Sequence, residues 1–571
     1  MSADVIRWTG GPGSGKTYQL LRDVQHEYVS GRSIDDLCLM SFSRAQAADL
    51  AKRLHTDVFP RAKKTAIASK CATIDASALR ACRAAGHIPT PRDQIIQPGE
   101  KKSIAVYGKF MAENRIPYSP VVQASDDDDP VSRASLPAGN QIVELNAYLT
   151  ATMQEPSDWM RAASALGLPF QGATWGIEDI LAAWVEYKAK LGVYEHGDYV
   201  SLALDTELDP PAPVLFVDEF QDVSPLQNAL IKHWIQSPET ERVYVAGDPD
   251  QSIYGFRGCS PDLFLALSAT DRGALAGDQP VSRRCPARVL RTAETLLGHQ
   301  PNVSPTEREG ISARATPRTT ENLVRQIEEG VRSAPAGQTG SAVFVLCRFR
   351  RHATQIARAI AAAGIPTSGI RDPTSGPWGN AWIGRSSKAL EHEAVNVWAL
   401  TRGVRRYLSD RPEPFPADEA AALVRATVLE PRRTELLDIL KARTAKRFPT
   451  RSGDLALWMG VGAAKLFEHL NLRPAFIEQI RNCIVRERQR GYEMSPSQVR
   501  VDTVHAAKGL ECPVVLLHTG YLKGLLEGLS VPERAAEERR VFYVGATRAS
   551  HALIAFDWVE PVWPVFGRAV V

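Results

Sequence analysis

Residues 10–17 have the composition of a phosphate-binding loop. They read Gly-Gly-Pro-Gly-Ser-Gly-Lys-Thr and fit the pattern G-x-x-x-x-G-K-S/T without a mismatch. An apolar run at residues 5–8 precedes them and a helical pattern follows, so we expect a strand, a loop and a helix rather than a chance glycine-rich stretch. The residues predicted to bind a nucleotide here are Gly10, Gly11, Pro12, Gly13, Ser14, Gly15, Lys16 and Thr17.

The chemistry of such a loop is phosphate binding. Glycines let successive backbone N–H groups point at phosphate oxygens, and the helix N-terminus adds positive potential. Lys16 supplies a cation for the β- and γ-phosphates, and the Thr17 hydroxyl is placed to hold Mg²⁺. The loop alone does not say which reaction follows.

Two adjacent carboxylates follow a second apolar run. Residues 214–217 are all apolar, and Asp218 and Glu219 come directly after them. An acid at the carboxyl end of a buried strand beside a P-loop can hold the metal ion through water. We therefore assign Thr17 and Asp218 to Mg²⁺ and Glu219 to the general base that polarises the attacking water.

Strand and helix patterns alternate at both ends of the chain. Further strands are expected at 37–41, 242–246, 342–346, 499–503 and 514–518, and helices at 44–54, 352–363 and 532–544. This alternation favours two parallel α/β sheets. The stretches from about 89 to 196 and from about 384 to 489 read as helical insertions. The second is broken by a Pro-rich stretch at 411–416, and the acidic run at 126–129 is predicted to be a solvated loop.

Composition sets broad limits. A chain of 571 residues, 44% hydrophobic and 23% charged, predicts roughly three or four globular domains. The net charge of +3 neither supports nor excludes nucleic-acid binding. Eight scattered cysteines without a C-x-x-C pair indicate reduced thiols. No apolar stretch predicts a signal region or a membrane span, so we expect a cytoplasmic protein with no membrane partner.

Residues 218–222, 247–258, 501–511 and 538–549 are longer segments that resemble the motifs of the UvrD/PcrA/Rep family of superfamily 1 helicases. Residues 218–222 and 247–258 resemble motifs II and III, residues 501–511 motif V, and residues 538–549 motif VI. The resemblance implies two RecA-like P-loop motor domains with ATP between them, each with a mainly helical insertion, the second reduced. The expected boundaries are 1–88 and 200–275 for the first motor domain, 89–199 for its insertion, 276–385 and 490–571 for the second motor domain, and 386–489 for its insertion.

The resemblance also implies roles at the nucleotide. Gln251 would sense the γ-phosphate, Arg284 and Arg548 would neutralise its developing charge, and Glu511 would reach the sugar. Arg283 stands where the family carries a base-stacking aromatic, and a guanidinium plane can stack as well. The nine residues before the loop hold no glutamine of the kind that reads adenine in the family, which leaves adenine selectivity open.

The same resemblance implies a single-stranded DNA track. Bases would stack on aromatic rings while hydroxyls, amides and cations hold phosphates, a mode that tolerates any sequence. Ordinary core packing is the alternative for Tyr254 and Phe256. Motif Ib carries Ile74 and Asp75 where the family has an aromatic and a histidine. The predicted DNA-binding residues are Phe42, Arg44, Thr73, Tyr254, Phe256, Arg257, Thr503 and His505.

The resulting prediction is an ATP-dependent DNA helicase of repair, replication or recombination. It would act as a monomer on single-stranded and tailed duplex DNA, with the 3′→5′ polarity of the family, and would use ATP and Mg²⁺. One alternative is a single-strand DNA translocase that removes proteins or remodels recombination intermediates without processive unwinding. A P-loop kinase and a DNA-binding scaffold with a decayed ATPase are further alternatives, which the motif set disfavours.

Overall fold

The computed structural model describes residues 3–89, 94–98, 100–120, 133–170, 176–315, 319–335, 340–372, 376–382, 394–409, 415–428, 432–441, 452–558 and 561–563. These residues form two compact units. Unit 1 comprises Met1–Gly310 and Glu527–Thr547, and unit 2 comprises Ile311–Leu526 and Arg548–Val571. The predicted acidic loop at 126–129 lies outside the described residues, as does most of the predicted Pro-rich break at 411–416.

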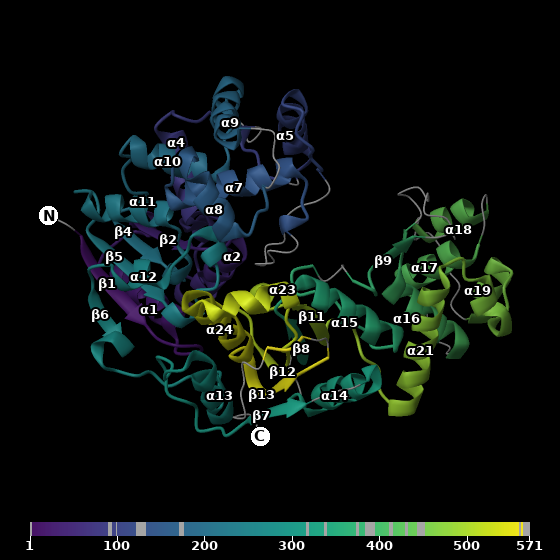
Figure 1. The fold of residues 1–571 in the computed structure, drawn as a ribbon. Coiled ribbons are helices and arrows are strands. Elements are labelled where there is room, and N and C mark those ends of the chain that lie inside the picture. Colours follow the sequence, from purple (N-terminus) through teal and green to yellow (C-terminus); the bar gives the residue numbers. More distant parts are fainter. Residues whose placement is uncertain are drawn as a thin grey trace. The chain divides into compact units, whose positions relative to one another are not determined.

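Unit 1 is built on a six-stranded sheet in which all paired strands are parallel (Figure 1). The strand order is β3-β2-β4-β5-β1-β6. The strands are β1 (Asp4–Thr9), β2 (Leu37–Ser41), β3 (Cys71–Thr73), β4 (Val214–Val217), β5 (Arg242–Gly247) and β6 (Thr270–Gly273). The sequence predicted β1, β2, β4 and β5 and missed the two edge strands.

Helices cover both faces of this sheet. Alternate residues of β4 point to opposite sides: Val214 and Phe216 pack with α1 (Lys16–Val29) and α2 (Arg44–Arg53). Leu215 and Val217 pack with α4 (Ile74–Ala84), α10 (His196–Asp205) and α11 (Pro225–Gln236). Because both faces are buried, the central strands read as continuous apolar runs, which is why the sequence revealed them.

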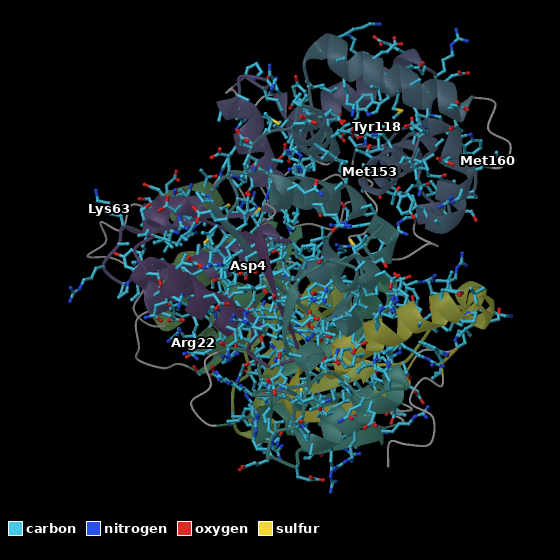
Figure 2. The ribbon with its side chains drawn as sticks, turned by 90° about the vertical axis from the view of Figure 1, so that its left-hand side faces the viewer. Asp4, Arg22, Lys63, Tyr118, Met153 and Met160 are labelled. Carbon is cyan, nitrogen blue, oxygen red and sulfur yellow. The ribbon has the colours of Figure 1, made fainter. Side chains whose placement is uncertain are left out.

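The insertion of unit 1 is helical, as predicted. Its longer helices are α5 (Lys101–Glu113), α7 (Ala138–Thr152), α8 (Trp159–Leu166) and α9 (Ile177–Leu191). They share a core that includes Tyr107, Phe110 and Trp184. In Figure 2, Tyr118, Met153 and Met160 mark this insertion, and Asp4 and Arg22 mark the sheet and α1.

A buried ion-pair network joins the insertion to α10. The Lys188 ammonium lies 2.7 Å from the Glu195 carboxylate and 2.6 Å from the Asp198 carboxylate. The Tyr107 hydroxyl and the Trp184 indole N–H also donate to Glu195, at 2.8 and 3.0 Å. Because the buried ammonium and carboxylates are mutually paired, their desolvation is offset, and the junction is held by directional contacts.

Residues 276–310 belong to unit 1. They include α13 (Ala287–Leu297), which packs on α24 (Pro532–Ala546) of the same unit. The predicted helix at 532–544 is thus confirmed, two residues longer at its end.

Unit 2 contains a second all-parallel sheet, of five strands in the order β11-β8-β12-β13-β7. The strands are β7 (Ile311–Ala315), β8 (Val343–Cys347), β11 (Val499–Thr503), β12 (Cys512–His518) and β13 (Ala549–Phe556). Residues of β8, β11 and β12 share a core with α14 (Thr320–Ser333) and α15 (Arg350–Ala362). Two RecA-like α/β layers with parallel sheets are therefore present, as predicted.

The insertion of unit 2 is also mainly helical and has its own apolar core. Its helices are α16 (Val397–Ser409), α17 (Ala417–Thr427), α18 (Arg432–Lys441), α19 (Ser452–Met459), α20 (Leu466–His469) and α21 (Pro474–Arg490). A short antiparallel pair, β9 (Asn380–Trp382) and β10 (Ala394–Asn396), precedes α16. Across the described residues, no helix is both long and apolar enough to cross a bilayer.

Candidate active site

The predicted P-loop joins the end of β1 to the start of α1. Gly13 and Gly15 have φ angles of 73° and 89°, in the left-handed region that glycine adopts without a steric penalty. A Cβ added at Gly13 would lie 2.7 Å from the Arg284 Cβ, so the loop and that arginine are in close contact. The Lys16 ammonium donates to the carbonyl oxygens of Gly10 and Gly11, at 2.7 and 3.2 Å.

Residues 282–302, also in unit 1, form hydrogen bonds with the P-loop. The Arg283 N–H donates to the Gly13 carbonyl at 2.8 Å, and the Ser282 hydroxyl donates to the Pro12 carbonyl at 2.8 Å. The Gly11 N–H donates to the Asn302 carbonyl at 2.7 Å. These bonds fix the loop against residues 282–302 and place Arg284 beside the phosphate-binding backbone.

The predicted metal ligands lie together. The Thr17 hydroxyl donates to the Asp218 carboxylate at 2.8 Å. Asp218 is 8% exposed, and burial, followed by the nearby charge of Glu219, raises its pKa to about 6. A hydroxyl and a carboxylate at the ends of α1 and β4 supply oxygen ligands of the kind that Mg²⁺ takes, so these residues fit that ion.

The predicted general base sits in a left-handed turn. Glu219 has a φ angle of 58°, an uncommon conformation for a non-glycine residue that is found preferentially at functional sites. It is followed by a single helical turn, Phe220–Asp222. The turn redirects the chain at the end of β4, so that Asp218 and Glu219 have different surroundings.

A hydrogen-bonded chain links Glu219 to Gln251. The Gln221 amide donates to the Glu219 carboxylate at 2.5 Å, and its oxygen accepts from the Asp248 N–H at 2.9 Å. The Gln251 amide donates to the Asp248 carboxylate at 2.6 Å. Burial raises the pKa of Asp248 to about 6. This relay, defined as Glu219, Gln221, Asp248 and Gln251, connects the ends of β4 and β5.

Gln221 and Asp248 had no role in the sequence analysis, although both stood inside the matched motifs. A second omission is Tyr18, which directly follows the P-loop threonine. The Arg283 guanidinium lies 5.1 Å from the centre of the Tyr18 ring, and Tyr18 is 48% exposed. Arg283 was predicted to stack on the nucleotide base, and its contact with Tyr18 was not predicted, because the two residues are far apart in the chain.

Four of the predicted DNA-binding residues form one cluster. The rings of Phe42 and Tyr254 are stacked, with centres 4.7 Å apart and planes at 27°. The Arg257 guanidinium lies 5.8, 5.5 and 5.7 Å from the ring centres of Phe42, Tyr254 and Phe256. We call Phe42, Tyr254, Phe256 and Arg257 the aromatic–arginine cluster. Tyr254 is 8% exposed, so its ring also packs in the protein, while Arg257 is exposed.

The other predicted DNA contacts of unit 1 are separate. Arg44 is exposed at the first turn of α2. The Thr73 hydroxyl caps α4 by accepting a hydrogen bond from the Ala76 N–H at 3.1 Å. Asp75 accepts a hydrogen bond from the Gln227 amide at 2.6 Å, and burial raises its pKa.

Four predicted site residues lie on unit 2. Thr503 is fully buried and caps the short helix Val504–Ala507, accepting from the Ala506 N–H at 3.3 Å. His505 is 2% exposed. Arg548 is 1% exposed and donates to the Leu510 carbonyl at 3.3 Å, next to the exposed Glu511. Arg548 and Glu511 are therefore neighbours within this unit.

A P-loop after β1, an acid pair after β4 and a glutamine relay after β5 define a P-loop NTPase of the RecA-like class. Family comparisons agree. Residues 176–271 match the UvrD/REP helicase N-terminal domain, and residues 464–556 match the UvrD-like helicase C-terminal domain.

Individual relatives carry helicase names. The chain is 25% identical over 366 residues to the ATP-dependent DNA helicase UvrD2 of Mycobacterium tuberculosis, covering 60% of this chain and 47% of that protein. It is 24% identical over 414 residues to the ATP-dependent DNA helicase srs2 of Schizosaccharomyces pombe, covering 59% and 46%. It is 37% identical over 97 residues to the ATP-dependent DNA helicase UvrD1 of Mycobacterium leprae, covering 15% and 12%.

These matches place the chain in the UvrD-like family of superfamily 1 helicases. The chain spans about half the length, or less, of the curated relatives it matches.

Proposed function

We propose that the protein is an ATP-dependent DNA motor that moves on single-stranded DNA and separates duplex ahead of it. The observation that carries the proposal is that the relay at the predicted nucleotide site ends close in the chain to the aromatic–arginine cluster. The relay runs from Glu219 to Gln251, and Tyr254 of the aromatic–arginine cluster follows Gln251 by three residues. A change at the γ-phosphate can thus reach the DNA contacts through a short turn.

ATP hydrolysis is assigned to the residues around the P-loop. Lys16 binds the β- and γ-phosphates, and Thr17 and Asp218 hold Mg²⁺, which when bound neutralises charge between those phosphates. Glu219 orients and polarises the attacking water. Gln251 senses the γ-phosphate, and Arg284, beside Gly13, stabilises the charge that develops on it.

Family resemblance supports further assignments. Arg548 and Glu511 of unit 2 are assigned to the γ-phosphate and to the nucleotide sugar. Arg283 and Tyr18 are assigned to stacking on the base. The 3′→5′ direction and a monomeric motor also rest on this resemblance.

ATP hydrolysis measured with and without single-stranded DNA tests the proposal. We expect strong stimulation by single-stranded DNA, which Lys16→Ala abolishes and Lys190→Ala leaves unchanged, since Lys190 is 75% exposed on α9. Hydrolysis that is indifferent to DNA, or absent, would contradict a DNA motor. Unwinding of 3′-tailed and 5′-tailed duplexes then separates a helicase from a translocase that does not unwind.

The aromatic–arginine cluster gives a quantitative expectation. Base stacking and cation–π contacts on such platforms contribute ~1–3 kcal/mol per base, so Arg257→Ala or Tyr254→Ala should weaken binding of a single-stranded oligonucleotide about 5- to 150-fold. ATP hydrolysis without DNA should stay unchanged. Fluorescence anisotropy of a labelled dT20 measures the affinity, with Arg22→Ala on α1 as the charge-matched control because Arg22 is exposed. Equal affinities in all variants would place the DNA elsewhere.

A further inference from the structure

A histidine far along the chain contacts the turn that carries Gln251. His299 follows α13, and its ring Nε2 lies 3.0 Å from Oδ1 of the Asp250 carboxylate. Asp250 stands directly before Gln251 in a single helical turn, Pro249–Gln251, which we call the Gln251 turn. An ionised carboxylate can only accept a hydrogen bond, so the ring N–H donates. His299 thus contacts the neighbour of the residue assigned to the γ-phosphate.

The two partners of this bond differ in exposure. The His299 side chain is 57% exposed, and the Asp250 side chain is 12% exposed. Burial raises the pKa of Asp250, while the charges of His299 and Arg540 oppose that shift. Among the residues that the structure describes, none hydrogen-bonds to the other oxygen of Asp250, Oδ2, which is buried. A bond between two exposed charges would contribute little, but loss of this ring removes the donor from a buried carboxylate.

The Gln251 turn is also held at its other end. Arg540 of α24 donates from Nε to the Ser252 carbonyl at 2.9 Å, just after Gln251. Within the turn, the Asp248 carboxylate accepts from the Asp250 N–H at 3.1 Å. The turn therefore has two outside anchors, Arg540 after Gln251 and His299 before it.

The chain segment that carries His299 also contacts the P-loop. Three residues after His299, the Asn302 carbonyl accepts from the Gly11 N–H at 2.7 Å. A Cβ added to Gly11 would lie 2.6 Å from Cγ1 of Val303, so the two segments approach closely. This short segment therefore contacts the P-loop at one end and the Gln251 turn at the other.

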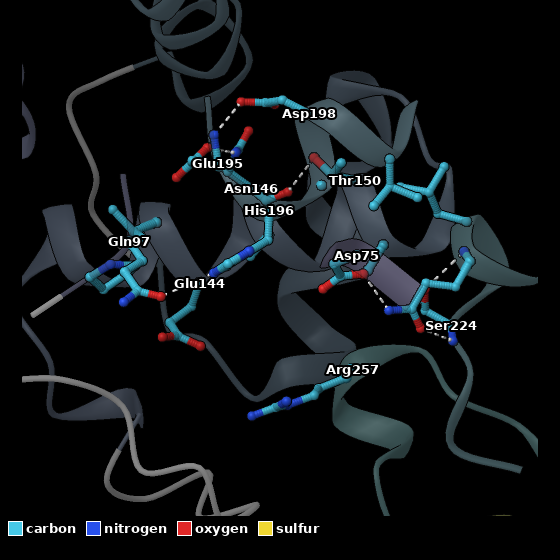
Figure 3. A pocket seen from close by; sticks show the side chains of 18 of the residues that line it. Asp75, Gln97, Glu144, Asn146, Thr150, Glu195, His196, Asp198, Ser224 and Arg257 are labelled. Carbon is cyan, nitrogen blue, oxygen red and sulfur yellow. Dashed lines mark hydrogen bonds between the residues drawn. The ribbon is translucent and has the colours of Figure 1, made fainter. Parts of the chain in front are cut away.

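A second histidine of unit 1 shows a different arrangement. Figure 3 shows His196 with Gln97 and Asp75 around a cavity, and its Nε2 lies 3.0 Å from the Gln97 side-chain oxygen. Of the described residues, those that line this cavity include no member of the relay. His196 thus links the start of α10 to the segment before α5, whereas His299 contacts the nucleotide side of the same unit.

We propose that His299 is a positioning residue for ATP hydrolysis, which through its bond to Asp250 holds the Gln251 turn in a fixed place relative to the P-loop. The inference rests on the proposed function, in which Gln251 senses the γ-phosphate. Without the bond, the turn loses one of its two outside anchors. A small displacement of Gln251 then slows the chemical step, while Lys16 and the P-loop backbone still bind the nucleotide.

Steady-state ATP hydrolysis with Mg²⁺ and saturating dT20 tests the proposal, with kcat and KM for ATP measured separately. We expect His299→Ala to lower kcat about 5- to 50-fold and to change KM by less than about twofold. His299→Gln should restore kcat to within about twofold of the wild-type value, because the glutamine amide can place an N–H donor near the position of the ring Nε2. His87→Ala makes the same substitution at an exposed position after α4 and should leave both constants unchanged.

A double-mutant cycle connects the effect to the bond itself. Asp250→Asn removes the carboxylate charge that His299 contacts. When His299→Ala is added to Asp250→Asn, kcat should fall further by less than about twofold, since both changes remove the same interaction. A further loss as large as that of His299→Ala alone would overturn the proposal, because His299 would then act through another group.

The remaining outcomes separate the inference from the proposed function. Wild-type kcat in His299→Ala, or a rise in KM as large as the fall in kcat, would overturn the positioning role but not the DNA-stimulated ATPase. So would a His299→Gln protein as slow as His299→Ala, provided that both show a wild-type thermal unfolding curve. Absence of ATP hydrolysis by the wild-type protein would overturn the proposed function and the inference with it.

Discussion

Replacing Glu219 with glutamine is expected to lower kcat for ATP hydrolysis by about 10²–10⁴-fold and to leave nucleotide affinity nearly unchanged. The amide keeps the size of the side chain and can still bond to Gln221, so the left-handed turn after β4 is preserved. It cannot take a proton from the attacking water. The loss should therefore appear in the chemical step and not in binding.

Two measurements distinguish a chemical role from a structural one. Steady-state hydrolysis gives kcat, and equilibrium binding of a fluorescent ATP analogue gives affinity. The exposed Glu186→Gln serves as the control for loss of one carboxylate. If Glu219→Gln weakened nucleotide binding as much as it lowered kcat, Glu219 would hold the site together instead of acting as the base. Unchanged kcat would assign the base to another residue.

Strands whose residues are nearly all buried could be predicted, including β11, which lies at the edge of the second sheet. The predicted ranges 37–41, 214–217 and 499–503 are the observed bounds of β2, β4 and β11. The edge strand β6, with the sequence Thr-Asp-Arg-Gly, contains no large apolar side chain and pairs with β1. β3 is three residues long. Such strands owe their conformation to the neighbouring strand, and hydrophobic patterning alone does not reveal them.

The candidate active site, like the fold, could be predicted only in part. Local spacing was enough to predict the P-loop and the acid pair, since each is a continuous segment whose backbone conformation follows from its residues. The relay was not predictable, because the bond from Asp248 to Gln221 joins residues 27 positions apart, in two different turns. The hydrogen bond from Gln227 to Asp75 joins residues 152 positions apart. The environment of Asp75 is therefore set by the fold and could not be predicted from the local sequence.

Removing the guanidinium of Arg284 is expected to lower kcat by about 10³–10⁵-fold, the range seen when an arginine that stabilises phosphoryl transfer is lost. The contact that supports this expectation lies within unit 1. The Arg284 Cβ lies where a side chain on Gly13 would clash, and the Arg284 carbonyl accepts from Arg308 at 3.0 Å. The backbone of this arginine is thus fixed against the phosphate-binding loop.

A series at this position tests geometry as well as charge. Arg284→Ala should lose ATP hydrolysis while retaining much of the affinity for nucleotide. The kcat of Arg284→Lys should be only slightly higher than that of Arg284→Ala, since an ammonium cannot bind two oxygens with a planar fork as a guanidinium does. Arg291→Ala on α13 is the control, because Arg291 is 61% exposed and pairs with Glu309. Full activity in Arg284→Lys would show that charge alone suffices. Near-wild-type kcat in Arg284→Ala would mean that the transferring phosphoryl group is stabilised without this side chain.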